Sequence, residues 1–397
     1  MKIHTAAQGH YPAKKKTQSK GGRGDRGLFV IIFSLCFLGL VMVYSTSSTL
    51  AWKNYADSAY YLKRQLAWTV LGIGAFSFLI QTDYHRLSEC IIPMAGGIFA
   101  LLLCVYFFGV DVNGARRWLR IGSISFQPSE FAKLFTVIYL AHYIAKKEEH
   151  LSEFVRGLWP VLLLLGVLSF LIWIEPDLGT TLTIAIITVI LLFIGGASLR
   201  HLAWVSSLAI PFVVFSLIHF PYMLQRVKTF IDPMSDPPSK SFQINQSFIA
   251  LGSGGPFGVG LGGGLQKLFF LPQPHTDFIF SVIGEELGLI GTTCVIILFV
   301  SLLWKGVKIA QGIEEPFGQI LAIGTTLLMV MPALMNMGVV TSLLPTKGLA
   351  LPFISYGGSS LVMNWAAAGI LYRVSMDIPV RRSQKKEKIL QMEGAHP

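Results

Sequence analysis

The chain has 397 residues, of which 53% are hydrophobic and 13% are charged, with a net charge of +11 and a mean hydropathy of +0.60. A soluble globular domain has roughly 25% charged residues, so this composition excludes an ordinary soluble fold. A disordered chain is excluded because so much apolar surface must be buried. The apolar runs lack the period-two alternation of an outer-membrane barrel, so they indicate an all-α polytopic integral membrane protein.

Ten apolar runs are long enough to cross a bilayer, at roughly 20 residues each. We expect transmembrane helices at 27–47, 65–82, 90–109, 128–145, 158–174, 178–197, 200–219, 277–304, 318–342 and 353–374. The first run is longer than the apolar core of a signal peptide, so we expect it to stay uncleaved. An even number of spans places both termini on one side of the membrane.

The distribution of positive charge orients these spans. The side with the termini carries 20 of the 32 Lys and Arg residues, which predicts that both termini are cytoplasmic. The one large loop, 220–276 between the seventh and eighth helices, is then extracytoplasmic, and loops of that length are usually functional. We expect one membrane domain at 27–375 with basic cytoplasmic tails at 1–26 and 376–397, in a multi-pass protein of the cytoplasmic (inner) membrane. The tails explain the excess charge, so no nucleic-acid partner is expected.

Unusual polar residues fall at the outer ends of spans or in outer loops, where they could meet at one site. The first cluster, Asn113 to Arg120, has three arginines on the face that the positive-inside rule disfavours. Arg116 and Arg117 suit a pyrophosphate, because each guanidinium donates two aligned hydrogen bonds. Binding to anionic lipid headgroups, with Trp118 as an interfacial anchor, explains them equally well.

Two further clusters place charges at span ends. Glu130 suits the positive N-terminus of its predicted helix, whereas Lys133, one turn deeper, needs a partner or a hydrated cavity. Lys133 therefore either pairs with Glu130 or contacts a bound anion, and the anion contact is slightly favoured. In the turn at 175–181, Asp177 suits the cap of the next helix, whereas Glu175 and Asp177 together could orient a lysine or a divalent cation, and capping is favoured for either residue.

The long outer loop contains eight glycines between 252 and 264. They match the G-x-G-x-x-G spacing by accident, because a dinucleotide site needs a βαβ unit. We expect these glycines to permit a tight re-entrant or surface path, on which the backbone approaches a ligand closely.

Asp277 lies at the outer mouth of the eighth predicted helix, shortly after His275. Taken alone, it is best explained as a first-turn acid satisfied by the helix macrodipole. Near basic outer loops, a carboxylate at this half-wet boundary is also suited to act as general base on a hydroxyl. Glu285 and Glu286 lie deeper in the same helix, where we expect them to bridge helices or to mark a polar path.

A Pro- and Gly-rich outer turn precedes the tenth predicted helix and again directs hydroxyls and a lysine outward. It contains Lys347, Ser355 and Tyr356, followed by Ser359 and Ser360. Serines also pack closely between membrane helices, which is the simpler explanation for the last two. The sequence contains no zinc-protease, P-loop, paired-cysteine or nucleophile-elbow motif, so any metal ligands are unknown.

Six motifs, in this order, resemble those of the SEDS family, the bacterial shape, elongation, division and sporulation glycosyltransferases. They are N-G-A-R-R-W at 113–118, Q-P-S-E-F-A-K at 127–133, E-P-D-L-G-T-T at 175–181, G-S-G-G-P-F-G-V-G-L-G at 252–262, H-T-D-F-I-F at 275–280 and P-F-I-S-Y-G-G-S-S at 352–360. The resemblance covers most of 27–375. Within the family, 345–348 and 266–280 look more like the FtsW members of the divisome than the RodA members of the elongasome.

The resemblance implies a ten-helix peptidoglycan glycosyltransferase that polymerises lipid II, an undecaprenyl-pyrophosphate-linked disaccharide peptide, on the outer face of the membrane. Its place would be the division septum. It puts Asp277 at the family's essential aspartate, and Glu130, Lys133 and Asp177 around the cavity. Asp277 would deprotonate the 4-hydroxyl of the acceptor GlcNAc as that oxygen attacks the donor's anomeric carbon. Arginines, lysines or a divalent cation (Mg²⁺ or Mn²⁺) would stabilise the leaving undecaprenyl pyrophosphate.

The candidate catalytic base is thus Asp277, and the candidate substrate-binding residues are Arg116, Arg117, Glu130, Lys133, Asp177, His275, Lys347, Ser355 and Tyr356. The implied partners are a class B penicillin-binding transpeptidase and divisome activating proteins. A lipid II flippase is the strongest alternative, supported by the deep acids Glu285 and Glu286. A non-catalytic divisome scaffold is a third alternative, which leaves the outer charges unexplained.

Overall fold

A computed structural model describes residues 24–112, 115–122, 124–231, 238–268, 271–346 and 348–378. Most residues in this part of the chain are helical, as the composition predicts. Each of the ten predicted apolar runs contains a long helix. These helices are α1 (Arg26–Tyr55), α2 (Tyr60–Gln81), α4 (Ile91–Phe108), α5 (Pro128–Lys147), α6 (Trp159–Ile174), α7 (Leu178–Ile194), α8 (Leu199–His219), α11 (Ile279–Gly312), α12 (Pro316–Val340) and α13 (Gly358–Ser375).

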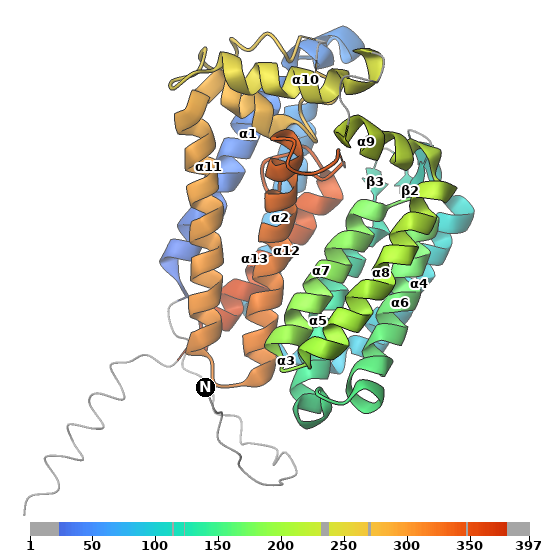
Figure 1. Cartoon of the computed structure of the whole chain (residues 1–397). Helices are drawn as coiled ribbons and strands as arrows, with labels where there is room; N and C mark the ends of the chain where they lie inside the picture. Colours follow the sequence, from blue (N-terminus) through green and yellow to red (C-terminus); the bar gives the residue numbers. More distant parts are fainter. Residues whose placement is uncertain are drawn as a thin grey trace, which may run out of the picture.

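The long helices run along roughly one common direction (Figure 1). One end of the bundle carries the shorter helices α9 (Pro221–Ile231) and α10 (Pro238–Ser253), and α3 (His85–Glu89) lies at the other end. The two ends of the described chain meet at the α3 end, where the Asp25 backbone N–H donates to Ser375 Oγ at 3.2 Å. The chain therefore crosses the bundle an even number of times between these two residues.

Six helical stretches in the described part of the chain are long and apolar enough to cross a membrane. They are α1, α4, α8, α11, α12 and Phe154–Ile174, in which the π-helix η2 (Phe154–Leu158) leads into α6. The other long helices are shorter or more polar, and two of them are enclosed: α5 packs against α4, α7 and α12, and α13 packs along α2. A helix surrounded by helices can carry polar groups that lipid would disfavour.

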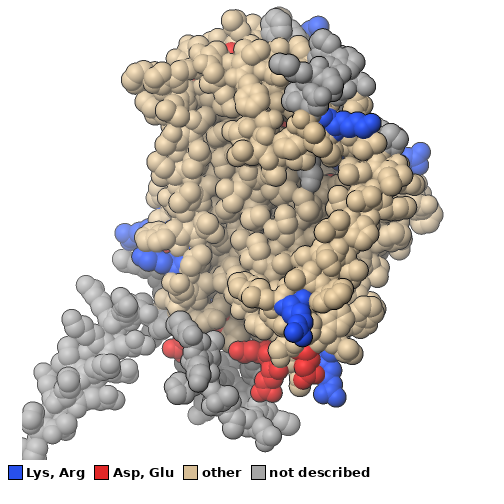
Figure 2. Space-filling model, viewed as in Figure 1, with Lys and Arg blue, Asp and Glu red and all other residues tan. Residues whose placement is uncertain are grey.

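The distribution of side chains on the surface is consistent with a bundle in which some helices face lipid and others are enclosed by their neighbours. On the face drawn in Figure 2, charged side chains lie toward the two ends of the molecule, and a band without them lies between. Many exposed side chains on α4, α8 and α11 are large and apolar, such as Phe107, Ile218 and Val300. Such a belt is what a bilayer requires of the helices that face it.

The segment between α4 and α5, which was expected to be a loop, contains three short strands. β1 (Val110–Val112), β2 (Ala115–Ile121) and β3 (Ile124–Phe126) form an antiparallel sheet in the order β1-β2-β3. The expectation of a purely helical chain is therefore wrong here. The segment is rich in β-branched and aromatic residues, which favour strands, and its apolar stretches are too short to form a spanning helix. A 3₁₀ turn, η1 (Glu148–His150), follows α5.

The long outer segment between α8 and α11 is not a structureless loop. After α9 and α10, the glycine-rich backbone folds back onto α11, where the N–H groups of Val259 and Gly260 donate to the carbonyls of Glu285 and Glu286, each at 3.0 Å. Two more bonds run from backbone N–H groups of α11 to the segment. The helix can offer these groups because its backbone breaks at Gly288, with φ 67° and ψ −160°.

The side chains of Glu285 and Glu286 reinforce this attachment. Glu285 Oε1 accepts two backbone N–H groups of the segment, at 2.7 and 3.1 Å. Glu286 forms an ion pair with buried Lys267 at 2.6 Å and accepts from the Ser45 hydroxyl of α1, also at 2.6 Å. The two deep acids thus bridge α11 to its neighbours. Gly254 and Gly258 bring the backbone of the segment against α11, and the expected approach to a ligand stays a prediction.

Gly258 tests this packing, because it has φ +79° and any Cβ would collide with the Glu286 carbonyl. We expect Gly258→Ala to destabilise the protein by about 1–3 kcal/mol from backbone strain alone, with the collision adding to it. Thermal unfolding in detergent measures the effect. Gly252→Ala in α10 is the control, because a Cβ there meets open space. Equal unfolding temperatures for the two variants would contradict the close approach.

Candidate functional site

Side chains from distant parts of the chain line one cavity of about 200 Å³ at the α9–α10 end of the bundle. Its polar lining residues are Arg117, Gln127, Glu130, Lys133, Asp177, Thr180, Gln273, Thr276, Asp277, Tyr356, Ser360 and Asn364. They come from β2, from the starts of α5, α7 and α13, and from the segment before α11. The structure therefore brings together six of the residues singled out in the sequence, namely Arg117, Glu130, Lys133, Asp177, Asp277 and Tyr356.

Asp277 is a half-buried carboxylate beside the start of α11. Loss of hydration raises its pKa to about 6, and the nearby positive charges of Arg226 and Arg117 oppose that rise. A Cβ at Gly348 would lie 3.0 Å from Asp277 Oδ2, so the glycine leaves space beside the carboxylate. A carboxylate with a pKa near 6 is a better proton acceptor than an ordinary aspartate and is still largely ionised at pH 7.

The backbone that carries Asp277 is fixed from outside its own segment. The carbonyls at 275–277 each accept one hydrogen bond from another element. The donors, in that order, are the Tyr356 backbone N–H at 2.9 Å, the Ser355 hydroxyl at 2.6 Å and the Asn336 side-chain amide of α12 at 2.7 Å. These bonds fix the backbone from which the Asp277 side chain projects, which is the kind of support that a functional side chain needs.

Glu130 and Lys133 lie on the buried face of α5 and form an ion pair of 2.7 Å between Glu130 Oε1 and Lys133 Nζ. The pair explains how a lysine is accommodated one turn inside the helix. Both side chains also line the cavity, so pairing and contact with a ligand are compatible. The helix starts at Pro128 because proline suits the first helical position.

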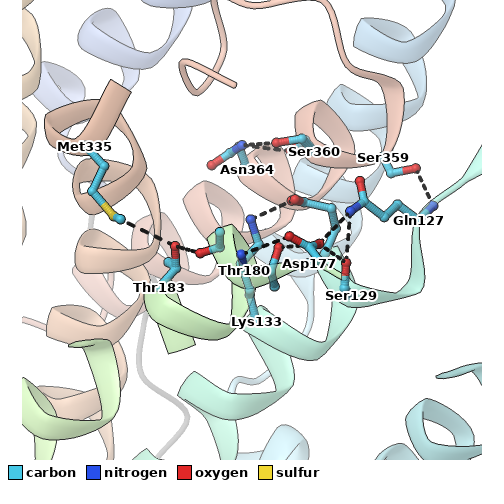
Figure 3. A network of polar contacts seen from close by, with 12 residues as sticks. Gln127, Ser129, Lys133, Asp177, Thr180, Thr183, Met335, Ser359, Ser360 and Asn364 are labelled. Atoms are coloured by element: carbon cyan, nitrogen blue, oxygen red, sulfur yellow. Dashed lines mark hydrogen bonds and ion pairs between the residues drawn. The ribbon is translucent and has the colours of Figure 1, made fainter. Parts of the chain in front are cut away.

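Asp177 connects the start of α7 to the start of α5 (Figure 3). It caps α7, since Oδ1 accepts from the Thr180 N–H at 3.1 Å. Its Oδ2 accepts from Thr180 Oγ1 at 2.8 Å, from Gln127 Nε2 at 3.1 Å and from Ser129 Oγ at 3.2 Å. Capping, the favoured interpretation, is therefore present, and these four donors hold the cavity wall together.

The two adjacent arginines of β2 point in different directions, because successive side chains on a strand face opposite ways. Arg117 turns inward and donates to the backbone carbonyls of Glu175 and Pro176, in the turn between α6 and α7. Arg116 is exposed and does not line the cavity. The expectation of an arginine pair acting on one diphosphate is not met by this arrangement.

A second cavity, of about 230 Å³, lies beside the first, between α7, α8 and α9. Its lining is mostly apolar and includes Leu182, Ala185, Phe212, Val213 and Leu217. Arg117 and Arg226 line it as well, and Arg226 Nη1 of α9 donates to the Thr346 carbonyl at 3.2 Å. Arg117, Asp177 and Gly348 line both cavities, so a polar and an apolar space share one wall.

Two other candidate residues, His275 and Ser355, are outside the cavity lining. His275 is buried against the rings of Tyr61 and Tyr356, and loss of hydration lowers its pKa to about 4, so its ring is neutral at pH 7. Ser355 is buried and supports the backbone instead of facing the cavity. Lys347 lies outside the described residues, as do Asn113 and Gly114 of the arginine cluster.

The sequence analysis missed Arg226, Asn336, Gln127 and Asn364. Arg226 is one of two basic residues on an amphipathic helix, and such a helix usually lies at the membrane surface. Asn336 is a single polar residue in an apolar run, which is a signal for a buried functional or supporting group. Gln127 and Asn364 were within or next to motifs but carry no charge to mark them.

The described residues contain no group of three or more His, Cys, Asp and Glu side chains that could hold a metal ion. Asp177, one of the two acids considered for a divalent cation, already accepts four hydrogen bonds. Glu130 is paired with Lys133. The described residues therefore do not form a recognisable metal centre.

Glu175 is a buried carboxyl group near the site that lacks hydrogen-bond partners in the described part of the chain. It is 3% exposed, and neither carboxylate oxygen has a hydrogen-bond partner within the described ranges. Loss of hydration, together with repulsion by Asp177, raises its pKa to about 8, although Arg117 acts in the opposite direction. The side chain is therefore mostly neutral at pH 7.

Comparison with known proteins gives a consistent result. A family model described as cell cycle protein, FTSW_RODA_SPOVE, matches residues 26–378. A protein of Geobacter metallireducens named probable peptidoglycan glycosyltransferase FtsW is 42% identical over 355 residues, which cover 89% of this chain and 95% of that protein. Stage V sporulation protein E of Bacillus subtilis is 38% identical over 353 residues, 88% of this chain and 96% of that protein.

Solved structures share the fold. The rod shape determining protein RodA of Thermus thermophilus superposes with a TM-score of 0.64 at 26% identity, covering 90% of this chain and 98% of that chain. A chain in a structure described as the coordination of polymerization and crosslinking by a peptidoglycan synthase complex gives a TM-score of 0.73 at 27% identity, covering 90% and 98%.

The neutral state of Glu175 predicts a pH dependence of stability. Because its pKa rises from 4.5 in the unfolded chain to about 8, its contribution to stability is fully present below pH 4.5 and is lost as the pH rises toward 8. We expect the free energy of unfolding to fall by up to about 1.4 kcal/mol per pH unit in this window, and Glu175→Gln to remove that fall. Unfolding temperatures at pH 5 to 8 measure it. The exposed Glu148→Gln is the control, and identical pH profiles for all three proteins would refute the prediction.

Proposed function

This chain belongs to the cell cycle protein family of FtsW, RodA and SpoVE, and we propose that it polymerises lipid II into glycan strands on the outer face of the cytoplasmic membrane during cell division. It is a glycosyltransferase, as its curated relatives are. The observation that carries the proposal is the position of Asp277, a half-buried carboxylate in a polar cavity that shares a wall with an apolar one.

The chemistry follows from this carboxylate. Asp277 accepts the proton of the 4-hydroxyl of the acceptor GlcNAc while that oxygen attacks the anomeric carbon of the donor. A bond forms between the hydroxyl oxygen and the anomeric carbon, and the bond from that carbon to the phosphate oxygen breaks. Undecaprenyl pyrophosphate leaves with the electron pair, and this direct displacement inverts the anomeric centre.

The two cavities suit the two parts of such a substrate. The polar cavity, with Glu130, Lys133 and Asp177, offers donors and acceptors to sugar hydroxyls. The apolar cavity accepts the first isoprene units of the leaving lipid. Arg117 and Arg226 line the apolar cavity and act electrostatically on Asp277, so they are the groups suited to stabilise the diphosphate. Roles for Arg116, His275, Lys347 and Ser355 in substrate binding stay predictions.

The proposal includes ten membrane spans with both termini cytoplasmic. Ten long helices coincide with the predicted runs, and the contact between Asp25 and Ser375 supports a shared side for the two ends. The excess of Lys and Arg on that side supports its assignment to the cytoplasm. The cavity with Asp277 then opens toward the outer face, where the lipid-linked sugars are polymerised.

A class B penicillin-binding transpeptidase and divisome activating proteins are the proposed partners, and the division septum is the proposed location. The description of the matching family as cell cycle protein supports the role in division. The similar chain from a peptidoglycan synthase complex supports a partner that crosslinks the strands. A requirement for Mg²⁺ or Mn²⁺ also stays a prediction.

The flippase alternative loses its main support. Lys267, Ser45 and a backbone N–H group contact Glu286, and two backbone N–H groups donate to Oε1 of Glu285, so both acids fasten a segment rather than line a path through the membrane. A scaffold without catalysis does not account for a carboxylate held at the edge of a polar cavity.

Replacing the proposed base tests the mechanism. We expect Asp277→Asn to lower the rate of polymerisation by about 10² to 10⁴, because an amide cannot accept the proton. Purified protein, lipid II and the transpeptidase partner are incubated in detergent, and glycan products are resolved on a gel. Asp57→Asn is the matched control, since Asp57 lies at the same end of the bundle outside the cavity lining. Ladders of equal length and yield from both variants would remove Asp277 from the chemistry, whereas the absence of ladders even from the wild type, with its partner present, would favour the flippase.

The pH dependence of the rate is a second test. Protonated Asp277 cannot act as a base, so we expect kcat/KM to fall about tenfold per pH unit below a midpoint near 6. Initial rates from pH 4.5 to 8, with unfolding followed in parallel, give the profile. A midpoint at or below 4 would show that the rate does not depend on a carboxyl in this desolvated position.

A further inference from the structure

A groove of about 430 Å³ between α1 and α11 lies at the opposite end of the bundle from the two cavities. It is lined by Arg26, Val30 and Ile31 of α1 and by Ser301, Trp304 and Lys305 of α11. The two helices pack against each other, and the groove is beside the meeting point of Asp25 and Ser375. In the proposed topology this is the inner surface of the membrane.

Positive charge borders the groove. Lys305 Nζ donates to both carboxylate oxygens of Asp25, at 3.0 and 2.9 Å, which fixes one cation across the junction of the two helices. Lys308 Nζ lies 4.0 Å from the centroid of the Trp304 ring, in a cation–π contact. Arg26 is exposed at the start of α1. Three cations therefore lie at or beside the groove, and one of them, Lys305, is paired with a carboxylate.

The groove becomes apolar within one helical turn. Val30 is 61% exposed, and Ile297 and Val300 of α11 are 58% and 57% exposed. Trp304 is 54% exposed at the boundary between the cations and this apolar surface, the position that tryptophan favours at a membrane interface. The combination fits an amphiphile with an anionic head and a hydrocarbon tail.

We propose that this groove binds an anionic phospholipid of the inner leaflet. Its phosphate lies between Arg26 and Lys308, and one acyl chain runs along Val30, Ile297 and Val300. The chain's own tails are unsuited to the groove, because residues 1–23 contain six Lys and Arg and no acid, and 379–397 are also net basic. Such tails favour an anionic membrane surface close to the groove instead.

The test uses purified full-length protein and phosphatidylglycerol. Protein is reconstituted in nanodiscs with phosphatidylglycerol in phosphatidylcholine, and retained lipid is counted by native mass spectrometry after transfer to detergent. The double variant Arg26→Gln/Lys308→Gln is compared with Lys146→Gln/Arg156→Gln. The second variant also removes one arginine and one lysine from this end of the bundle, but away from the groove. We expect about tenfold weaker retention in the first variant and no change in the second.

Three results would overturn the proposal. The first is equal phosphatidylglycerol retention in both variants. The second is displacement of the lipid by soluble glycerol 3-phosphate, which would indicate a free-anion site. The third is unchanged retention with loss of binding to the transpeptidase, which would make the groove a protein contact. Because a variant could misfold, a photoactivatable phosphatidylglycerol is also added to the wild type. Labelling of 26–31 and 301–308 supports the site, and labelling spread evenly over the lipid-facing helices refutes it.

Discussion

A charged side chain packed among helices needs a partner, because burial removes the water that would otherwise stabilise it. This constraint governs how the bundle is connected. The pair Glu130–Lys133 lies within α5, Lys267–Glu286 attaches the glycine-rich segment to α11, and Asp25–Lys305 links the start of α1 to the end of α11. The carboxyl group of Glu175 has neither such a pair nor a hydrogen bond among the described residues, and its pKa is shifted toward the neutral form, as the same constraint requires.

The catalytic proposal rests on the same constraint applied to Asp277. Its carboxylate is only half-buried, has two arginines near it, and is held through its backbone by groups from α12 and from the turn before α13. A base must be accessible to its substrate and still fixed in position. Fixing the backbone instead of the carboxylate leaves the oxygens available to a hydroxyl.

The sequence predicted the helices well, and each long apolar run overlaps one of them. A long apolar run in a membrane has to be helical, because only a helix satisfies all of its backbone N–H and C=O groups internally. The sequence also identified residues that meet at one cavity, since charges at the outer ends of spans can meet wherever those ends converge. The sequence did not predict which of these side chains face the cavity, because strand geometry and tertiary contacts determine their directions. Strand alternation separates Arg116 from Arg117, and tertiary contacts turn Ser355 into a support and bring Arg226 beside the site. The glycine-rich segment could not be read as a partner of α11, because nothing in its own composition indicates the break at Gly288.

The contacts at the two ends of the described chain have a consequence for biosynthesis. Tyr356 and Ser355, just before the last helix, hold the segment that carries Asp277, and α13 packs along α2 near the start of the chain. Helices enter the membrane in order from the ribosome, so the packing of α13 along α2 and the part of the cavity lining that Ser360 and Asn364 provide form only after the final helix has been inserted. A nascent chain stalled before α13 would contain most of the helices but not the complete cavity beside Asp277, so the proposed mechanism keeps it inactive until its synthesis is complete.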